Sequence, residues 1–62
     1  MQILYCITNN GTRYHTTNSL NNDEQCHAIR MIEMENIKFI LCETLNEGDI
    51  LIPLTSIQKI KL

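Results

Sequence analysis

The chain has 62 residues, with five basic and seven acidic side chains and a formal net charge of -2 at pH 7. These charges are spread along the sequence, so no block of basic residues indicates a nucleic-acid-binding tail. No apolar run reaches the roughly 20 residues that a membrane-spanning helix needs. We therefore expect one small β-rich domain over residues 1–62 that is soluble, cytoplasmic and not attached to a membrane.

A chain this short hides only about 60% of its unfolded surface, so its fold needs support from disulfides, a metal or further copies of itself. The three cysteines, Cys6, Cys26 and Cys42, are odd in number and widely spaced, and no basic-then-apolar signal segment precedes them. This pattern indicates a reducing compartment rather than a disulfide framework. Disulfides are therefore not the expected support.

The first local signal is the segment QILYCITNNGTRYHTT, which predicts a β-hairpin. Asn10-Gly11 is a pair that accepts positive φ at both centres of a type I′ turn. A two-residue loop there pairs Cys6 with His15. The predicted core face carries Ile3, Tyr5, Ile7 and Tyr14, and the opposite face carries Leu4, Cys6, Arg13 and His15.

A short helix is predicted near residues 22–35. Asn21 and Asn22 can cap its start, and Ala28, Ile29 and Ile32 follow at helical spacing. A strand through residues 28–35 with a turn at Asn36 is the alternative, because the side chains there also alternate in polarity. The capping signal favours the helix, and the strand stays open.

A second hairpin follows, with strands over residues 37–45 and 49–54 and with Gly48 in the left-handed position of the turn. Pro53 offers no N–H to a ladder, so it belongs at a sheet edge or at the end of a strand. Residues 54–57 then predict one tight turn, and residues 57–62 predict a last short strand.

This order of elements predicts an α+β fold that is mostly β: two hairpins plus a short C-terminal strand in a bent sheet or small open barrel, with one short helix. The second hairpin and its Ile-Pro-Leu-x-x-Ile-x-x-Ile ending over residues 52–60 resemble the C-terminal part of small SH3-like and Sm-like barrels. The resemblance is one of architecture.

Cysteine and histidine together first suggest zinc, because thiolate and imidazole are its preferred ligands. Neither a C-x-x-C nor an H-x-x-x-H spacing occurs in the sequence. Cys6 opposite His15 resembles a nucleophile and its base, but a chain of this length has little material for a substrate pocket, and it lacks a glycine-rich phosphate loop. We expect no enzyme, no metal and no other cofactor.

Basic side chains give the candidate binding residues: Arg13, His15, Lys38, Lys59 and Lys61. With an aromatic neighbour they could form a surface on which bases stack. Lysine along a sheet edge is also how sheets avoid sticking to one another, so the residue pattern alone does not favour nucleic acid.

The first and third strand segments carry apolar residues on both faces, which one short helix cannot cover, so a homo-oligomer is expected. We expect a non-catalytic protein-interaction or regulatory module, inhibitor-like in action. Its many isoleucines and asparagines are typical of AT-rich coding, as in a phage or mobile element of a low-GC bacterium. The alternatives are a small-barrel nucleic-acid-binding protein and a protein that sequesters a small ligand between subunits.

Overall fold

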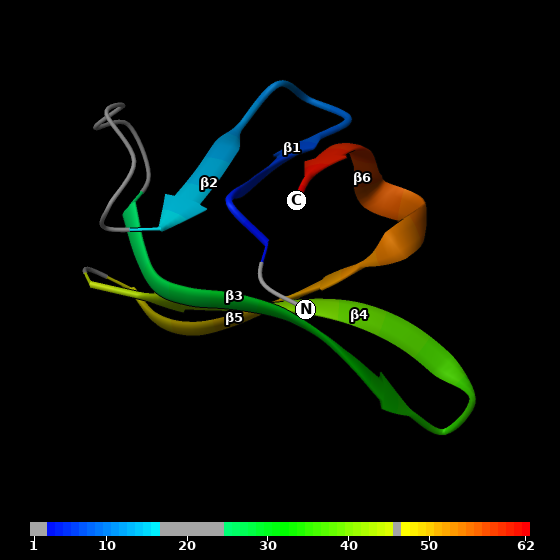
Figure 1. Ribbon diagram of the computed structural model, residues 1–62. Helices are drawn as coiled ribbons and strands as arrows, with labels where there is room; N and C mark the ends of the chain where they lie inside the picture. Colours follow the sequence, from blue (N-terminus) through cyan, green and yellow to red (C-terminus); the bar gives the residue numbers. More distant parts are fainter. Residues whose placement is uncertain (1–2, 17–24, 46) are drawn as a thin grey trace.

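A computed structural model describes residues 3–16, 25–45 and 47–62. Its elements are β1 (Tyr5–Thr8), β2 (Arg13–Thr16), β3 (Gln25–Met34), β4 (Ile37–Thr44), β5 (Gly48–Pro53), the 3-10 turn η1 (Leu54–Ser56) and β6 (Ile57–Lys61). The strands form one open sheet in the order β5-β4-β3-β2-β1-β6, in which only β2 and β3 pair in parallel (Figure 1). The prediction of a mostly β chain is confirmed.

The sheet folds over so that β2, β1 and β6 lie above β3, β4 and β5 in the view of Figure 1. Cys6 in β1 and Cys42 in β4 share a hydrogen bond, although two strands separate them in the sheet. This contact requires the two halves to face each other across a common core. The buried apolar members of that core are Ile3, Cys6, Cys26, Ile29, Ile40, Cys42 and Ile52.

The helix predicted near residues 22–35 is wrong over residues 25–34, which form β3, while residues 22–24 lie outside the described part of the chain. The strand with a turn at Asn36 is what the structure contains. β3 pairs with β4 from Cys26 to Met34, and this long antiparallel ladder outweighs the local helical spacing. The spacing of apolar residues within residues 25–34 could not reveal this ladder, because the strand that pairs with β3 lies further along the chain.

The first hairpin forms as expected, but its loop has three residues instead of two. The Gly11 N–H donates to the Thr8 carbonyl at 2.9 Å, and the Thr8 N–H donates to the Thr12 carbonyl at 2.9 Å. Gly11 has a positive φ of 90°, whereas Asn10 does not have a positive φ. A type I turn followed by a left-handed glycine fits this pattern, and the predicted type I′ turn does not.

The extra loop residue shifts the register of β1 on β2 by one position. Cys6 pairs with Tyr14, and Tyr5 pairs with His15. Because side chains alternate along a strand, a shift of one residue exchanges the two faces. The predicted core face is therefore wrong in β1: Cys6 points into the core, and Tyr5 points away from it.

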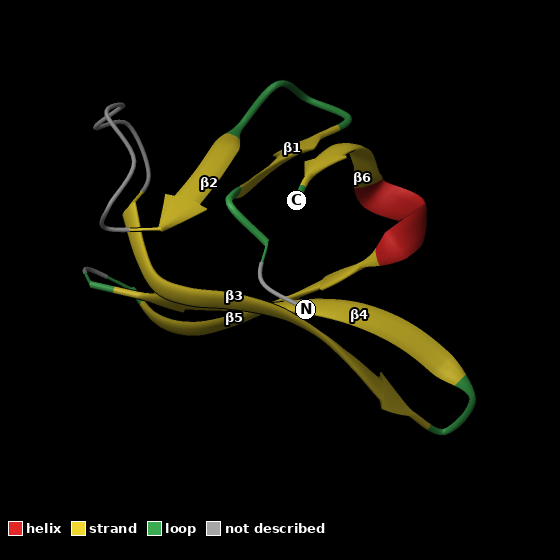
Figure 2. Cartoon of the chain, viewed as in Figure 1, coloured by secondary structure: helices red, strands yellow, loops and turns green. Residues whose placement is uncertain are grey.

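The C-terminal part of the chain follows the expectations closely. Gly48 has a φ of 75° in the turn before β5, and Pro53 ends β5, which is an edge strand. Figure 2 shows η1 bending the chain between β5 and β6. Asn9 ties this bend to the first hairpin, because its N–H donates to the Ser56 carbonyl and its Nδ2 donates to the Thr55 carbonyl, both at 2.9 Å.

The turn between β3 and β4 offers a stability test. Glu35 and Asn36 have φ values of 51° and 67°, as a two-residue type I′ turn requires, and asparagine tolerates this region better than glutamate does. Replacing Glu35 with asparagine is expected to raise the free energy of unfolding by about 0.5 to 1 kcal/mol, measured by urea denaturation. Glu33→Asn is the control, since it removes the same charge from the body of β3; an equal gain there would assign the effect to charge.

Candidate functional site

Most of the predicted basic binding residues gather on the outer face of β2, β1 and β6. Ile7 of β1 pairs with Arg13 on one side and with Lys59 on the other, and Tyr5 pairs with Lys61. Residues directly opposite one another on neighbouring strands point to the same side of a sheet. We call the surface formed by Tyr5, Arg13, Lys59 and Lys61 the basic face.

Tyr5 is the centre of the basic face. The guanidinium carbon of Arg13 lies 4.9 Å from the centroid of its ring, and Nζ of Lys59 lies 5.9 Å from it. Both distances are in the range of cation–π attraction. Sequence reasoning missed Tyr5, because the one-residue register error placed it in the core.

The remaining two predicted binding residues lie elsewhere. His15 is opposite Tyr5 in the ladder, but its side chain is fully buried, so it does not offer a surface contact. Lys38 lies in β4 opposite Glu33, in the other half of the molecule. The structure therefore joins Arg13, Lys59 and Lys61 and leaves the other two apart.

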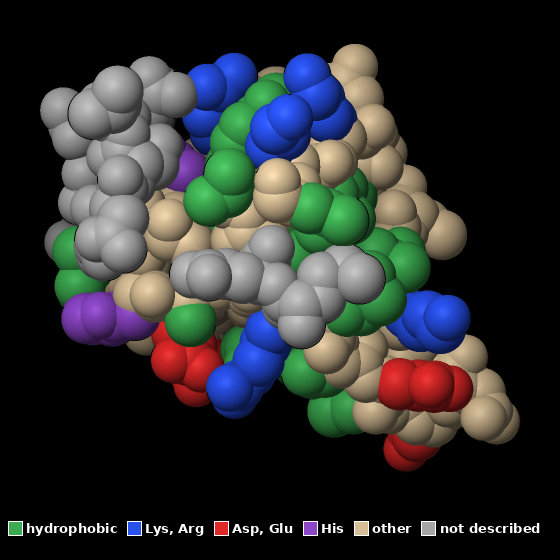
Figure 3. Space-filling model, viewed as in Figure 1, with side chains coloured by type: hydrophobic (Ala, Val, Ile, Leu, Met, Phe, Trp, Pro, Cys, Tyr) green, Lys and Arg blue, Asp and Glu red, His purple; other side chains and the backbone are tan. Residues whose placement is uncertain are grey.

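The fold also separates charges that are mixed in the sequence. Neither residues 3–16 nor residues 54–62 contain an acidic side chain. The acidic residues of the described chain lie between β3 and β5: Glu33, Glu35, Glu43, Glu47 and Asp49. Figure 3 shows Lys and Arg side chains without acidic neighbours over β1, β2 and β6, whereas Asp and Glu lie on the opposite half together with other Lys and Arg side chains.

A second surface is the outer face of β3, β4 and β5. Residues that are directly opposite one another share this side of the sheet; for example, Ile32 pairs with Phe39, and Phe39 pairs with Pro53. We call this surface the apolar face; it consists of Ile32, Met34, Ile37, Phe39, Leu41, Leu51 and Pro53. The exposed fractions of Met34, Ile37 and Leu51 are 45%, 52% and 42%.

One end of the apolar face is charged. Arg30 and Glu43 form an ion pair of 3.1 Å across β3 and β4. Asp49 of β5 lies directly opposite Glu43, so it shares this side of the sheet. The Arg30 side chain remains 60% exposed, which leaves guanidinium N–H groups available for another acceptor.

The three cysteines lie in the core, fully buried and not joined by disulfides. The Cys42 side chain is hydrogen-bonded to Cys6, and this bond together with burial raises the pKa of Cys42 far above the ordinary thiol range. A thiol that stays protonated is a poor nucleophile. Cys6 also faces away from His15 in the observed register, so the Cys6–His15 pairing that a two-residue loop would give does not form.

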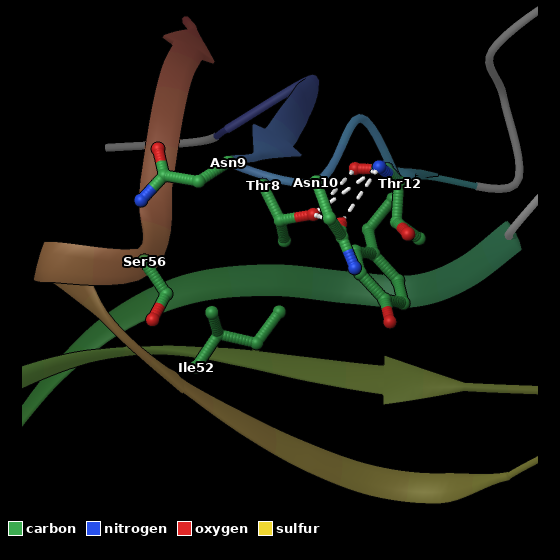
Figure 4. A pocket seen from close by; sticks show the side chains of 7 residues that line it. Thr8, Asn9, Asn10, Thr12, Ile52 and Ser56 are labelled. Atoms are coloured by element: carbon green, nitrogen blue, oxygen red, sulfur yellow. Dashed lines mark hydrogen bonds between the residues drawn. The ribbon is translucent and has the colours of Figure 1, made fainter.

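No group of three or more side chains that could hold a metal ion occurs in the described ranges. A shallow pocket of about 320 Å³ lies between the first hairpin and the segment around η1, with Ile52 and Ser56 on its lower side (Figure 4). Its polar groups are largely bonded to each other: the Thr12 N–H donates to Oγ1 of Thr8 and to Oδ1 of Asn10, both at 3.2 Å. The lining contains no carboxylate, imidazole or thiol.

The strand pairing places the basic face and the apolar face on the sides of the sheet opposite the buried core. In the part of the chain that the structure describes, no helix is long and apolar enough to cross a membrane.

Comparisons with known proteins do not assign a family: no family model, curated protein or solved structure matches the chain.

Proposed function

We propose that this protein is a non-catalytic binding module that self-associates through its apolar face and works by contacts between protein chains. The apolar face carries this proposal. Contiguous apolar patches that stay exposed mark interaction surfaces in soluble proteins. Here three large side chains on one face of a small sheet are each more than 40% exposed: Met34 at 45%, Ile37 at 52% and Leu51 at 42%.

A second copy of the chain fits this face because Arg30 and Asp49, which have opposite charges, lie on different strands of the face, β3 and β5. A two-fold axis parallel to the strands lays β3 of one copy over β5 of the other. Arg30, with its exposed guanidinium, then lies beside Asp49 of the second copy. The same axis brings Phe39 and Leu41 of both copies together at the centre, since both belong to the middle strand β4.

The interior of the molecule supports a non-catalytic role. The pKa of Cys42 is raised, so its thiol stays neutral, and the lining of the pocket beside the first hairpin contains no carboxylate, imidazole or thiol. Buried cysteines that are not joined by disulfides fit a reducing compartment, so the cytoplasm is the proposed location.

Within the mostly β architecture, we propose that the fold is a small open barrel of the SH3-like or Sm-like type. Two features support this assignment. The six-stranded sheet folds over a single core, and a 3-10 turn follows Pro53 and leads into the last strand.

Amide NMR spectra of the labelled full-length chain, recorded between about 10 µM and 1 mM, test the proposal. Dilution is expected to shift the amides of β3, β4 and β5 around Phe39, Leu41 and Leu51, and to leave β1, β2 and β6 unchanged. Spectra that do not change with concentration would overturn self-association. Shifts confined to β1, β2 and β6 would overturn the choice of surface.

A regulatory role would use the same face for a different protein. In that case, a purified partner displaces the second copy, and its addition shifts the amides that dilution shifts. A partner that shifts only the amides of β1, β2 and β6 would contradict a role for the apolar face in regulation.

A further inference from the structure

The basic face concentrates positive charge on a molecule that is acidic as a whole. Arg13, Lys59 and Lys61 are three of the five basic residues of the chain, and the formal net charge is -2. No acidic side chain lies in residues 3–16 or 54–62, which supply β1, β2, η1 and β6. Such a separation attracts and orients a negatively charged partner toward one side of the protein.

These cations are not neutralised by ion pairs within the described residues. The ion pair found there joins Arg30 to Glu43 in the other half of the molecule. Arg13 and Lys59 instead contact the ring of Tyr5 at 4.9 and 5.9 Å. A cation–π contact does not cancel the charge of Arg13 or of Lys59, so each of these two side chains still attracts an anion.

The spacing of the cations fits a chain of phosphates. Lys59 and Lys61 are alternate residues of β6, so they share one side of the strand about 6.6 Å apart. This is close to the separation of neighbouring phosphates in an extended nucleic-acid strand. Arg13 lies two strands away across β1, which places it beside such a strand rather than in line with the two lysines.

The planar groups on this face favour nucleic acid over other polyanions. The guanidinium carbon of Arg13 lies over the ring of Tyr5, 4.9 Å from its centroid, and bases stack on aromatic and arginine side chains without sequence preference. The face rests on short strands, and the described residues place no helix on it that could enter a duplex groove. An unpaired strand offers both the phosphates and the accessible bases.

We propose that the basic face binds single-stranded nucleic acid, with Arg13, Lys59 and Lys61 contacting phosphates and the Arg13–Tyr5 stack supporting a base. The site lies on the half of the molecule opposite the apolar face, so it does not depend on self-association. A dimer formed through the apolar face carries two such sites facing outward.

Fluorescence anisotropy of a labelled oligothymidine with the full-length chain tests this proposal. Three phosphate contacts predict that the logarithm of the association constant falls with the logarithm of salt concentration at a slope of about -2. Affinity should therefore fall about 20-fold between 50 and 200 mM salt. Lys59→Gln and Lys61→Gln should each weaken binding and reduce the slope by about 0.7.

Lys38→Gln is the matched control, because it removes the same charge from the other half of the chain, where Lys38 faces Glu33. Its affinity and salt slope should equal those of the unmodified protein. Equal losses in Lys38→Gln and Lys59→Gln would overturn the assignment of the site to the basic face. Absence of binding at 50 mM salt would overturn the proposal itself.

Two further probes separate other polyanions. Vesicles containing phosphatidylserine should not compete with the oligonucleotide, and a DNA duplex should bind more weakly than the single strand. Vesicle binding that depends on Lys59 and Lys61, without oligonucleotide binding, would assign the face to a lipid surface instead. These assays use dilute protein and measure binding at the basic face only. A negative result in them therefore does not bear on self-association, and a negative result for self-association does not bear on nucleic-acid binding.

Discussion

Replacing Ile40 with alanine is expected to remove a large share of the free energy of unfolding. Ile40 is fully buried at the centre of β4, between the two halves of the folded sheet. Truncating a buried isoleucine to alanine costs about 2 to 5 kcal/mol, from lost burial and the cavity left behind. Domains of this length have free energies of unfolding of only about 3 to 9 kcal/mol.

Urea denaturation followed by circular dichroism measures this loss. Leu4→Ala is the control, since Leu4 is 45% exposed, and it should cost less than about 1 kcal/mol. An Ile40→Ala variant as stable as Leu4→Ala would show that the two halves of the sheet do not pack on each other through this residue.

The second large effect is expected from Leu51→Asp, which should weaken self-association at least about 100-fold. Leu51 is exposed in the single chain but pairs with Leu41 on the apolar face. A carboxylate buried there without a partner costs more than about 2 to 3 kcal/mol, which corresponds to that change in the dissociation constant.

Leu4→Asp is the matched control for this variant. It makes the same chemical change at a similarly exposed leucine, before β1 and outside the apolar face. Both variants should keep the circular dichroism spectrum of the unmodified protein. If Leu4→Asp dissociates the oligomer as strongly as Leu51→Asp does, the contact lies on another surface.

The local features of this chain could be predicted from the sequence. Gly48 takes the left-handed position of its turn, and Pro53 ends an edge strand before a tight turn. In both cases the backbone preference of one residue decides the structure: glycine accepts positive φ, and proline offers no N–H to a ladder.

Features that depend on distant partners could not be predicted in the same way. Residues 25–34 form a strand because of their ladder with β4, which local helical spacing does not reveal. The loop around Gly11 has one more residue than the Asn10-Gly11 pair suggested, and that single residue exchanges the faces of β1. Propensity and turn preferences are weak compared with such pairing.

The candidate site combines residues that the sequence alone identifies with contacts that only the fold creates. Arg13, Lys59 and Lys61 are recognisable in the sequence as exposed cations, but only the pairing of β6 with β1 brings the lysines to the first hairpin. The position of Tyr5 on the basic face depends on the register of β1 on β2. The separation of basic from acidic side chains depends on the fold. The apolar face was foreseen in part, because the third strand segment carries apolar residues on both sides.

Sedimentation equilibrium of the unmodified chain tests self-association most directly. Between about 10 µM and 1 mM, the mass should rise from that of one chain, 7.2 kDa, toward twice this value. Leu51→Asp should stay at the single-chain mass over the same range. A folded protein that remains a single chain at the highest concentration would contradict the proposal that its apolar face joins two copies.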